Sequence, residues 1–356
     1  MELISIDLLR ALTEAPSPSG SETPAGRVYR EYTQGFADLV TSDVMGNIAA
    51  VINPDATTRI MLAAHMDEIG FVIHFIGEDG LLHFGGIGGH NDVIPVGQRV
   101  WVHGKERLPG VVGTQAYHLL DPAEQSKRPQ IKNLWIDIGA SSRAAAEAVV
   151  EVGDSVTFQH EFHPLLCDRA TARAFDNKAG VFIMAEAIRL LKQRGGLHPE
   201  VGVHAVATVQ EELGSRGVQA ATFGIKPTTG LGIDMEHAID YPGIEQRQHG
   251  RLALGNGPTI CRGPNINPVV LELLIAAAHE ENIAYQMSVY PKATPTDAGA
   301  MQVGRAGVAT GLVGVPIRYM HTPCEVLSLT DLENCARLVA GYCRLITPQI
   351  DFRPLV

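Results

Sequence analysis

Alternation between apolar strand-like segments and amphipathic helix-like segments constrains the fold of this chain more than any other feature. Residues 59–65 (RIMLAAH) are almost all apolar, which is typical of a strand buried on both faces of a sheet. After Asp176 the alternation continues, with a helix predicted over residues 177–196 and a strand over residues 201–210. Strands that alternate with helices favour a mostly parallel sheet with helices on both faces.

A stretch of different texture interrupts this alternation. Residues 67–163 contain short β-rich runs separated by glycine-rich turns, which is the pattern of a small β-barrel or sandwich, and one helix is predicted there over residues 141–153. A chain of 356 residues is long enough for two domains. We therefore predict a mixed α/β domain, formed by residues 1–66 and 164–356, that carries an inserted β-rich domain.

Composition and charge narrow the partners that such a chain can have. Lys and Arg number 28 against 39 Asp and Glu, so the formal net charge is −11. An acidic chain without a basic run gains nothing from releasing counterions, so we expect no nucleic-acid partner and no membrane surface partner. No apolar stretch approaches the ~20 residues of a membrane span. The start of the chain lacks signal-peptide features, and the five cysteines show no CxxC, so we expect a cytoplasmic protein with reduced thiols.

Histidines and carboxylates recur where the predicted strands of the α/β domain end, and ligands of α/β sheets collect at the carboxyl ends of strands. His65 and Asp67 come at the end of the first of these strands. Residues two apart on an extended backbone face the same side, and a carboxylate commonly orients a metal-ligating histidine. The alternative is a core histidine beside a turn aspartate.

Further acidic positions follow later in the chain. Asp176, in RAFDNKAG, lies at a predicted helix start, where it is either an N-cap or a carboxylate aimed at a site. Glu211 and Glu212 follow an apolar strand. Their side chains diverge, so one can bind a cation while the other faces a substrate, although acidic residues also favour a first helical turn. Asp234 ends another apolar strand and is either a ligand or a loop cap.

His321, in GVPIRYMHTPCEV, follows the last predicted strand. We interpret Cys324, three residues later, as a small buried residue, because no second cysteine pair would complete a zinc motif. Histidines and carboxylates together form a mixed N/O donor set, which suits zinc, cobalt or manganese. Such a set could hold two metal ions, with a spare glutamate as general base. The sequence contains no GxxxxGK[ST], GxSxG or HExxH motif that would point to another chemistry.

Five segments, AAHMDEIGF, RAFDNKAG, VQEELGSRG, GIDM and RYMHTP, resemble in this order the cytoplasmic glutamyl or deblocking aminopeptidases, also called tetrahedral aminopeptidases. The resemblance covers essentially the whole chain, including the β-rich insertion. The order and spacing of five motifs make it specific, since any one motif alone would be weak. It implies a zinc-peptidase-like α/β fold and a metal-dependent aminopeptidase that removes the N-terminal residue of short peptides.

The resemblance also implies a role for each candidate residue. Two divalent ions, zinc or cobalt, would be held by five ligands: His65 and Asp234 for one ion, Glu212 and His321 for the other, and Asp176 as the bridge. Asp67 matches the carboxylate that orients the first histidine, and Glu211 matches the general base. In this family the bridging aspartate often precedes a non-proline cis peptide, which here would be Asp176–Asn177.

Assembly and specificity are implied less fully. The β insertion resembles the family's dimerisation domain, and its dimers build hollow tetrahedral dodecamers that admit short peptides. An N-acyl amino-acid deacylase or another metallohydrolase on the same scaffold, such as a glycan-active enzyme, is the alternative function, and a non-catalytic binding protein is a further one. The motifs do not fix the preferred N-terminal residue. Arg262 could favour acidic side chains or serve only the structure.

Overall fold

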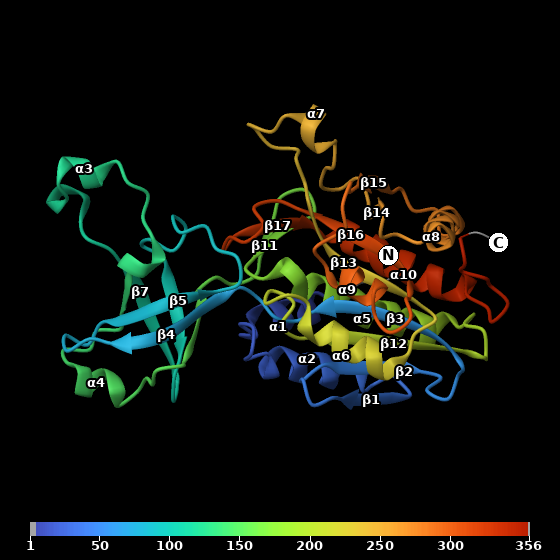
Figure 1. Ribbon diagram of the computed structural model, residues 1–356, viewed down its shortest axis with the longest axis horizontal. Helices are drawn as coiled ribbons and strands as arrows, with labels where there is room; N and C mark the ends of the chain where they lie inside the picture. Colours follow the sequence, from blue (N-terminus) through green and yellow to red (C-terminus); the bar gives the residue numbers. More distant parts are fainter. Residues whose placement is uncertain (1–4, 355–356) are drawn as a thin grey trace. The chain divides into compact units, whose positions relative to one another are not determined.

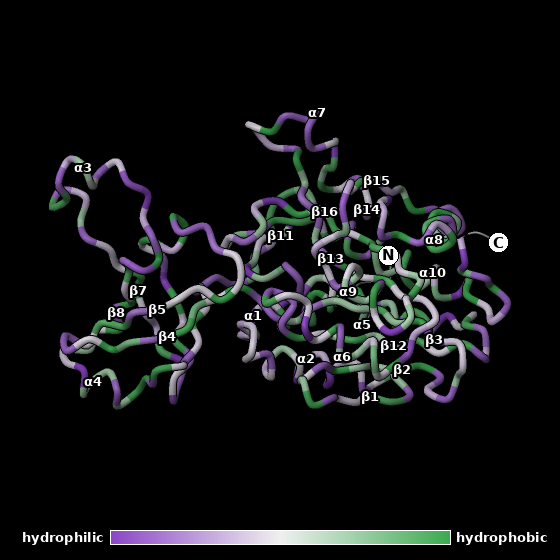
Figure 2. Tube along the Cα trace, viewed as in Figure 1, coloured by the Kyte–Doolittle hydropathy of each residue, from purple (hydrophilic) through white to green (hydrophobic). Residues whose placement is uncertain are grey.

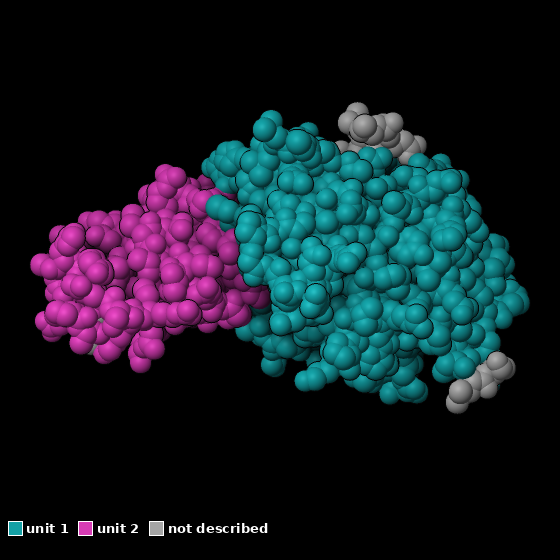
Figure 3. Space-filling view, turned by 90° about the horizontal axis from the view of Figure 1, so that it is seen from above, with its two compact units in different colours: residues 1–67, 161–320, 324–356 teal, residues 68–160, 321–323 magenta. Residues whose placement is uncertain are grey.

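The computed structural model describes residues 5–354, which form two compact units. The larger unit comprises the chain up to Asp67, Glu161–Met320 and the residues from Cys324 onward. The smaller unit comprises Glu68–His160 and the short segment His321–Pro323 (Figure 3). The grouping of this short segment with the smaller unit was not predicted from the sequence.

The larger unit is built on one mixed, mostly parallel sheet of eight strands in the order β1-β2-β12-β3-β13-β16-β14-β15 (Figure 1). The bounds are β1 Leu39–Ser42, β2 Ile48–Ile52, β3 Thr58–His65, β12 Val201–Thr208, β13 Thr229–His237, β14 Thr259–Arg262, β15 Gln286–Val289 and β16 Ala309–Ile317. Strands β12, β3, β13 and β16 run parallel, and so do β14 and β15. The other neighbouring pairs are antiparallel. The predicted fold class is confirmed.

Helices cover both faces of this sheet, because its central strands are apolar on both sides. Along β3, Ile60, Leu62 and Ala64 belong to the larger core, while Met61 and Ala63 belong to a separate core on the other side. The larger core is covered by α1 Ile6–Glu14, α2 Thr23–Thr33, α5 Phe175–Arg194, α8 Pro268–Glu280 and α10 Leu329–Leu345. The other is covered by α6 Arg216–Ile225 and α9 Asp297–Gln302. Figure 2 shows hydrophobic residues along the central strands.

The register of three parallel strands brings their carboxyl ends to one place. His65, the last residue of β3, pairs with Thr208, the last residue of β12. On the other side of β3, Gly232 of β13 pairs with Ala63, so Asp234 lies level with His65. The predicted site residues at the end of β3, in the loop after β12 and in β13 therefore lie at the same edge of the sheet. Asp234 was predicted to end its strand, but β13 continues to His237.

The smaller unit is a closed antiparallel barrel in the order β4-β5-β8-β7-β6-β9. The bounds are β4 Gly70–Ile76, β5 Leu82–Ile87, β6 Arg99–His103, β7 Arg107–Gly113, β8 Trp135–Asp137 and β9 Ser155–Phe158. The helix predicted over residues 141–153 is shorter, because α4 covers only Arg143–Glu147. Beyond α4, Val150 packs into the barrel core and Gly153 adopts a φ of 105°, which turns the chain into β9.

The remaining elements are short. A three-stranded sheet joins β10 His163–Leu165, β11 Arg169–Ala172 and β17 Glu325–Ser328, and short helices occur at Tyr117–Leu119, α3 Pro122–Gln125, Ile131–Asn133 and α7 Gln246–His249. The interpretation of Cys324 as buried was wrong: it is exposed, because it lies in the connection between β16 and β17 rather than in the core. Among residues 5–354, no helix is long and apolar enough to cross a membrane.

Candidate metal centre

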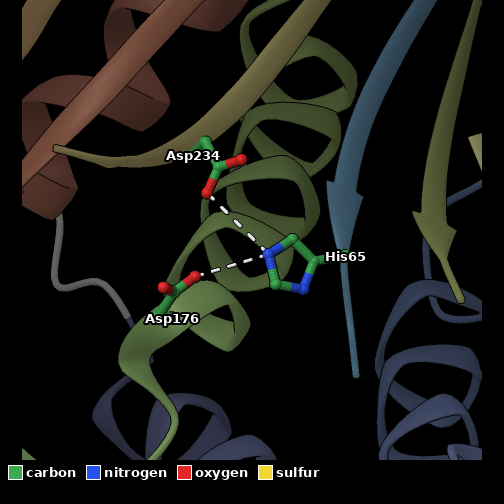
Figure 4. A group of neighbouring side chains, drawn as sticks. All are labelled: His65, Asp176 and Asp234. Atoms are coloured by element: carbon green, nitrogen blue, oxygen red, sulfur yellow. Dashed lines mark ion pairs between the residues drawn. The ribbon is translucent and has the colours of Figure 1, made fainter. Parts of the chain in front are cut away.

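His65 lies at the centre of the candidate site. It ends β3 and is 2% exposed, and its Nε2 lies 3.3 Å from Asp176 Oδ1 and 3.8 Å from Asp234 Oδ1 (Figure 4). Its Nδ1 lies 3.1 Å from the backbone oxygen of Asp67. With the proton on Nδ1 donated to this oxygen, the lone pair of Nε2 faces the carboxylates, which is the state in which a histidine binds a metal ion.

Asp67 holds two parts of the site together. Its Oδ1 lies 3.4 Å from His65 Nδ1 and accepts a hydrogen bond from the backbone N–H of Glu211 at 3.0 Å. Its Oδ2 accepts from Ser19 Oγ at 2.6 Å and from the backbone N–H of Glu212 at 3.2 Å. Burial would raise the pKa of Asp67, but the hydrogen bonds and the nearby imidazole outweigh it and hold that pKa below its ordinary value. Asp67 therefore stays charged and anchors the loop after β12.

Asp176 and Asn177 open α5 in a non-helical conformation, and the peptide bond between them is cis, as the resemblance implied. The backbone N–H of Asp176 donates to Glu325 Oε2 at 3.1 Å. Asn177 is fully buried, and its Nδ2 donates to the backbone oxygen of Ile233 at 2.8 Å. This bond fixes the start of α5 to β13 one residue before Asp234, so it places two carboxylates of the site against each other.

Glu211 and Glu212 lie in the loop after β12, where Gln210 adopts a left-handed φ of 55°. Ser215 Oγ donates to Glu211 Oε1 at 3.1 Å, and Glu211 Oε2 lies 3.9 Å from His65 Nε2. Carboxylate oxygens of Glu212 and Asp176 come within 4.8 Å of each other. The two adjacent glutamates thus serve different contacts, as their divergence along the backbone predicted.

Several buried or half-buried carboxylates concentrate negative charge at the site. Within the described residues, His65 is the one basic side chain that forms ion pairs with Asp67, Glu211 and Asp234. Burial, with the carboxylates of Asp176 and Glu211 adding to it, raises the pKa of Asp234 well above its ordinary value. Burial also raises the pKa of Glu211 to about 7, although the nearby imidazole opposes this. One imidazole cannot offset this repulsion, whereas a divalent cation would.

The donor chemistry fits a divalent ion. Ligand atoms of His65, Asp176 and Asp234 lie within 4.8 Å of one another, and all three residues are buried. One imidazole nitrogen with carboxylate oxygens is a ligand set for zinc, cobalt or manganese. The sequence-predicted residues of the larger unit are therefore brought together.

His321 belongs to the smaller unit. It has a left-handed φ of 59°, and its Nδ1 lies 2.9 Å from the backbone oxygen of Gly89 in the same unit. This contact directs the imidazole, as a hydrogen bond from one ring nitrogen commonly does in metal-ligating histidines. Its role as a metal ligand stays a prediction from the RYMHTP motif.

Sequence reasoning missed several polar residues around the site. Ser19 was not singled out, and Asn177 was named only for its cis peptide and not for its hydrogen bond to β13, because the partners of both side chains lie far away in the sequence. Asp297 was also missed. It is 2% exposed, accepts a hydrogen bond of 2.5 Å from Thr208 Oγ1, and contributes to the raised pKa of Glu211. Asp297 begins α9, and a position at a helix start is the signal that drew attention to Asp176.

Comparisons with known proteins agree with this geometry. The family model of the M42 glutamyl aminopeptidases matches residues 46–338. The lysyl aminopeptidase of Pyrococcus furiosus is 33% identical to this chain over 99% of this chain and 100% of its own length. A TET aminopeptidase structure from the marine sediment archaeon Thaumarchaeota archaeon SCGC AB-539-E09 matches with a TM-score of 0.91, at 34% identity over 96% of each chain.

A second solved structure extends the comparison. The Pyrococcus horikoshii TET1 peptidase, which can assemble into a tetrahedron or a large octahedral shell, matches with a TM-score of 0.84 at 29% identity, over 95% of this chain and 98% of its own. These matches span nearly the whole chain and both of its units. As the five sequence motifs predicted, the chain belongs to the M42 glutamyl aminopeptidase family and is a peptide hydrolase.

Proposed function

We propose that this chain removes the N-terminal residue of short peptides with two divalent metal ions, zinc or cobalt, and with Glu211 as the general base. The observation that carries the proposal is the convergence of His65, Asp176 and Asp234 in one buried cluster, with Glu211 Oε2 only 3.9 Å from the imidazole of His65. The family membership and the aminopeptidase activity named for its relatives support the same reaction.

The ligands divide into two sets around one shared carboxylate. His65 and Asp234 would bind one ion, and Glu212 and His321 would bind the other. Asp176 would bridge them, and its proximity to His65 and Asp234 on one side and to Glu212 on the other supports this role. Divalent ions in such a site polarise the scissile carbonyl and lower the pKa of a water molecule.

Glu211 is suited to move the proton of the reaction. A pKa of about 7 is close to the value at which a general base works best near neutral pH. Ser215 Oγ holds Oε1, while Oε2 faces the cluster. Glu211 would take a proton from the attacking water and return it to the leaving amine. Asp67 would act as the positioning residue, because it binds both the histidine and the backbone of the loop that carries Glu211.

Metal depletion and substrate blocking test this function directly. We expect the full chain to lose peptide hydrolysis after chelation and to regain it with zinc or cobalt. A peptide with a free N-terminus should be cleaved, and its N-acetylated form should not. Equal cleavage of both forms would favour the alternative, a deacylase or another metallohydrolase. Retention of full activity by the metal-free chain would contradict the metal-dependent mechanism.

The two adjacent glutamates provide a matched pair of variants. Glu211→Gln should keep nearly normal metal content and lose about 10²-fold to 10⁴-fold in kcat, as expected for removal of a general base. Glu212→Gln should instead lower the metal content, measured by elemental analysis. Wild-type kcat in Glu211→Gln would show that the base was assigned wrongly.

Assembly and location belong to the same proposal. We expect a cytoplasmic homo-oligomer in which the barrel unit, predicted as the inserted domain at residues 67–163, forms dimers that assemble into a dodecamer. The shells of the related TET1 peptidase support this assembly. Light scattering of the purified chain should give the mass of twelve chains, and a monomeric mass would refute it.

A further inference from the structure

The end of β13 carries a second carboxylate beyond the metal centre. Glu236 follows Asp234 by two residues, so both side chains lie on the same face of the strand. At a rise of ~3.3 Å per residue, their Cα atoms are roughly 7 Å apart. Glu236 is 6% exposed, and within residues 5–354 it forms no ion pair with a lysine or arginine. A buried carboxylate without a cationic partner is costly, so its presence calls for an explanation.

A cavity of about 600 Å³ lies beside this carboxylate. The chain segment after β13 and the end of β15 supply its walls. Half of the lining residues are apolar or aromatic, among them Ile239, Leu252 and Tyr290, and the others are polar, charged or glycine. The volume is in the range of pockets that bind small molecules. The cavity thus combines apolar walls with one buried carboxylate, and all of its lining residues belong to the larger unit.

The carboxylate is held in a defined position. Tyr290 donates a hydrogen bond of 2.5 Å from its hydroxyl to Glu236 Oε1. On the neighbouring strand β16, Gly314 leaves space for this side chain, because a Cβ there would lie 3.1 Å from the Cβ of Glu236. A cation that entered the cavity would stabilise the charged carboxylate.

We propose that this cavity receives the side chain of the substrate's N-terminal residue and selects lysine and arginine, with Glu236 binding the cationic end. The inference rests on the aminopeptidase function proposed above, because that function holds the substrate's N-terminal residue beside Asp234. Lysine and arginine have an aliphatic stem that packs on apolar walls and a charged end that needs a carboxylate. The Cα atoms of Asp234 and Glu236 are roughly 7 Å apart, which is comparable to the length of an extended lysine side chain.

Acidic and apolar side chains fit this cavity less well. An acidic side chain would depend on Arg251, His237 and His249, which also line the cavity but are exposed to solvent, where positive charge is screened. An apolar side chain would pack against the apolar part of the walls but would leave the carboxylate of Glu236 buried without a counter-charge. The buried position of the carboxylate and the exposed position of the arginine therefore favour a basic side chain.

The sharpest test compares two substrates that differ only in the charged group. Lysyl and norleucyl anilides share the same aliphatic stem, and only the first carries the ammonium. With the metal-loaded full chain, we expect kcat/KM to be about 30-fold or more higher for the lysyl substrate, mainly through a lower KM. Glu236→Gln, which keeps the shape of the side chain, should remove most of this ratio.

Two further variants separate the parts of the cavity. Tyr290→Phe keeps the carboxylate but removes the hydroxyl that orients it, so the lysyl-to-norleucyl ratio should fall by about fivefold. Arg251→Ala is the matched control at the exposed part of the lining and should leave the ratio within about twofold. A ratio near one in the wild type, or an unchanged ratio in Glu236→Gln, overturns the inference. So does a preference for glutamyl substrates that Arg251→Ala abolishes.

A binding measurement keeps this inference separate from the proposed function. Hydrolysis that favours norleucyl substrates contradicts the inference and leaves the aminopeptidase function intact. Absence of hydrolysis for every free N-terminal substrate contradicts the proposed function itself. In that case calorimetry with lysinamide and norleucinamide still tests the cavity. The inference is supported if the wild type binds lysinamide more tightly than norleucinamide and Glu236→Gln abolishes this difference. Equal affinities of the wild type for the two amides overturn it.

Discussion

Replacing Asp67 with asparagine would test whether one buried carboxylate organises the metal centre. The substitution keeps the shape of the side chain but turns one acceptor oxygen into an NH₂ donor. In the native chain Oδ1 accepts from the backbone N–H of Glu211, and Oδ2 accepts from Ser19 Oγ and from the backbone N–H of Glu212. The less disruptive orientation places the new NH₂ group at the position of Oδ2. There the hydroxyl of Ser19 can rotate and accept a hydrogen bond from the NH₂ group. The backbone N–H of Glu212 is itself a donor, so its hydrogen bond is lost.

The expected cost follows from this geometry. One hydrogen bond to a charged acceptor is lost, and bonds of this kind are worth about 1.5–3 kcal/mol. The free energy of unfolding should fall by that amount, and the Tm by about 2 °C for each kcal/mol in a domain of this size. The substitution also weakens the contact between residue 67 and the imidazole of His65, which helps to orient that proposed ligand. Metal affinity or kcat/KM should therefore fall about 10-fold to 100-fold.

The stability assay uses chelated protein, because bound metal would stabilise the native state by mass action and hide the effect. Urea unfolding followed by circular dichroism gives the free energy, and aminoacyl-anilide hydrolysis with measured metal content gives the activity. Asp137→Asn is the matched control, because Asp137 is exposed and its Oδ1 accepts a backbone N–H from Gly139 at 2.7 Å. If Asp67→Asn unfolds like the control and keeps its kcat/KM within twofold, Asp67 does not anchor the loop.

Two further predictions concern the stability of the fold. Burial, with the charge of Arg59 adding to it, lowers the pKa of His204 to about 4, below the ~6.5 of an unfolded chain. The folded chain holds His204 in its neutral form, and this contribution to the free energy of unfolding is fully present above pH 6.5. It is lost as the pH falls toward 4, which lowers the free energy of unfolding by at most about 3 kcal/mol. His204→Gln should flatten the dependence of unfolding free energy on pH in that window, and parallel curves for the two proteins would contradict this. Gly180→Ala should lower the free energy of unfolding by about 1–3 kcal/mol, because a Cβ would lie 2.2 Å from Asn177 Oδ1. In calorimetric scans the control Gly224→Ala, whose Cβ would meet nothing within 4 Å, should be neutral or stabilising, and equal Tm values for the two variants would refute the steric argument.

Periodicity and local motifs sufficed for the architecture and for a set of candidate residues in the larger unit that the structure brings close together. The apolar run at residues 59–65 is β3, because burial on both faces of a sheet gives a local sequence pattern. The helix predicted over residues 177–196 is α5, which is buried along most of its length. The position of Asp67 after a strand and that of Asp176 at a helix start were also readable from local patterns, whereas Asp234, predicted to end its strand, lies within β13. The predicted helix over residues 141–153 was too long, because the barrel core takes Val150 instead.

What only the tertiary structure decided is which distant groups meet. Asp67 was expected to orient His65, and the fold adds that it binds the backbone N–H groups of the loop after β12, over 140 residues away in the sequence. The carboxylate Glu236 resembles a strand-end residue in the sequence, and only the tertiary structure buries it, bonds it to Tyr290 and places it beside a cavity. The sequence by itself determined the α/β class and the ligand types, because these depend on patterns within single segments. The arrangement around them depends on loop conformations and long-range hydrogen bonds, which no short pattern encodes.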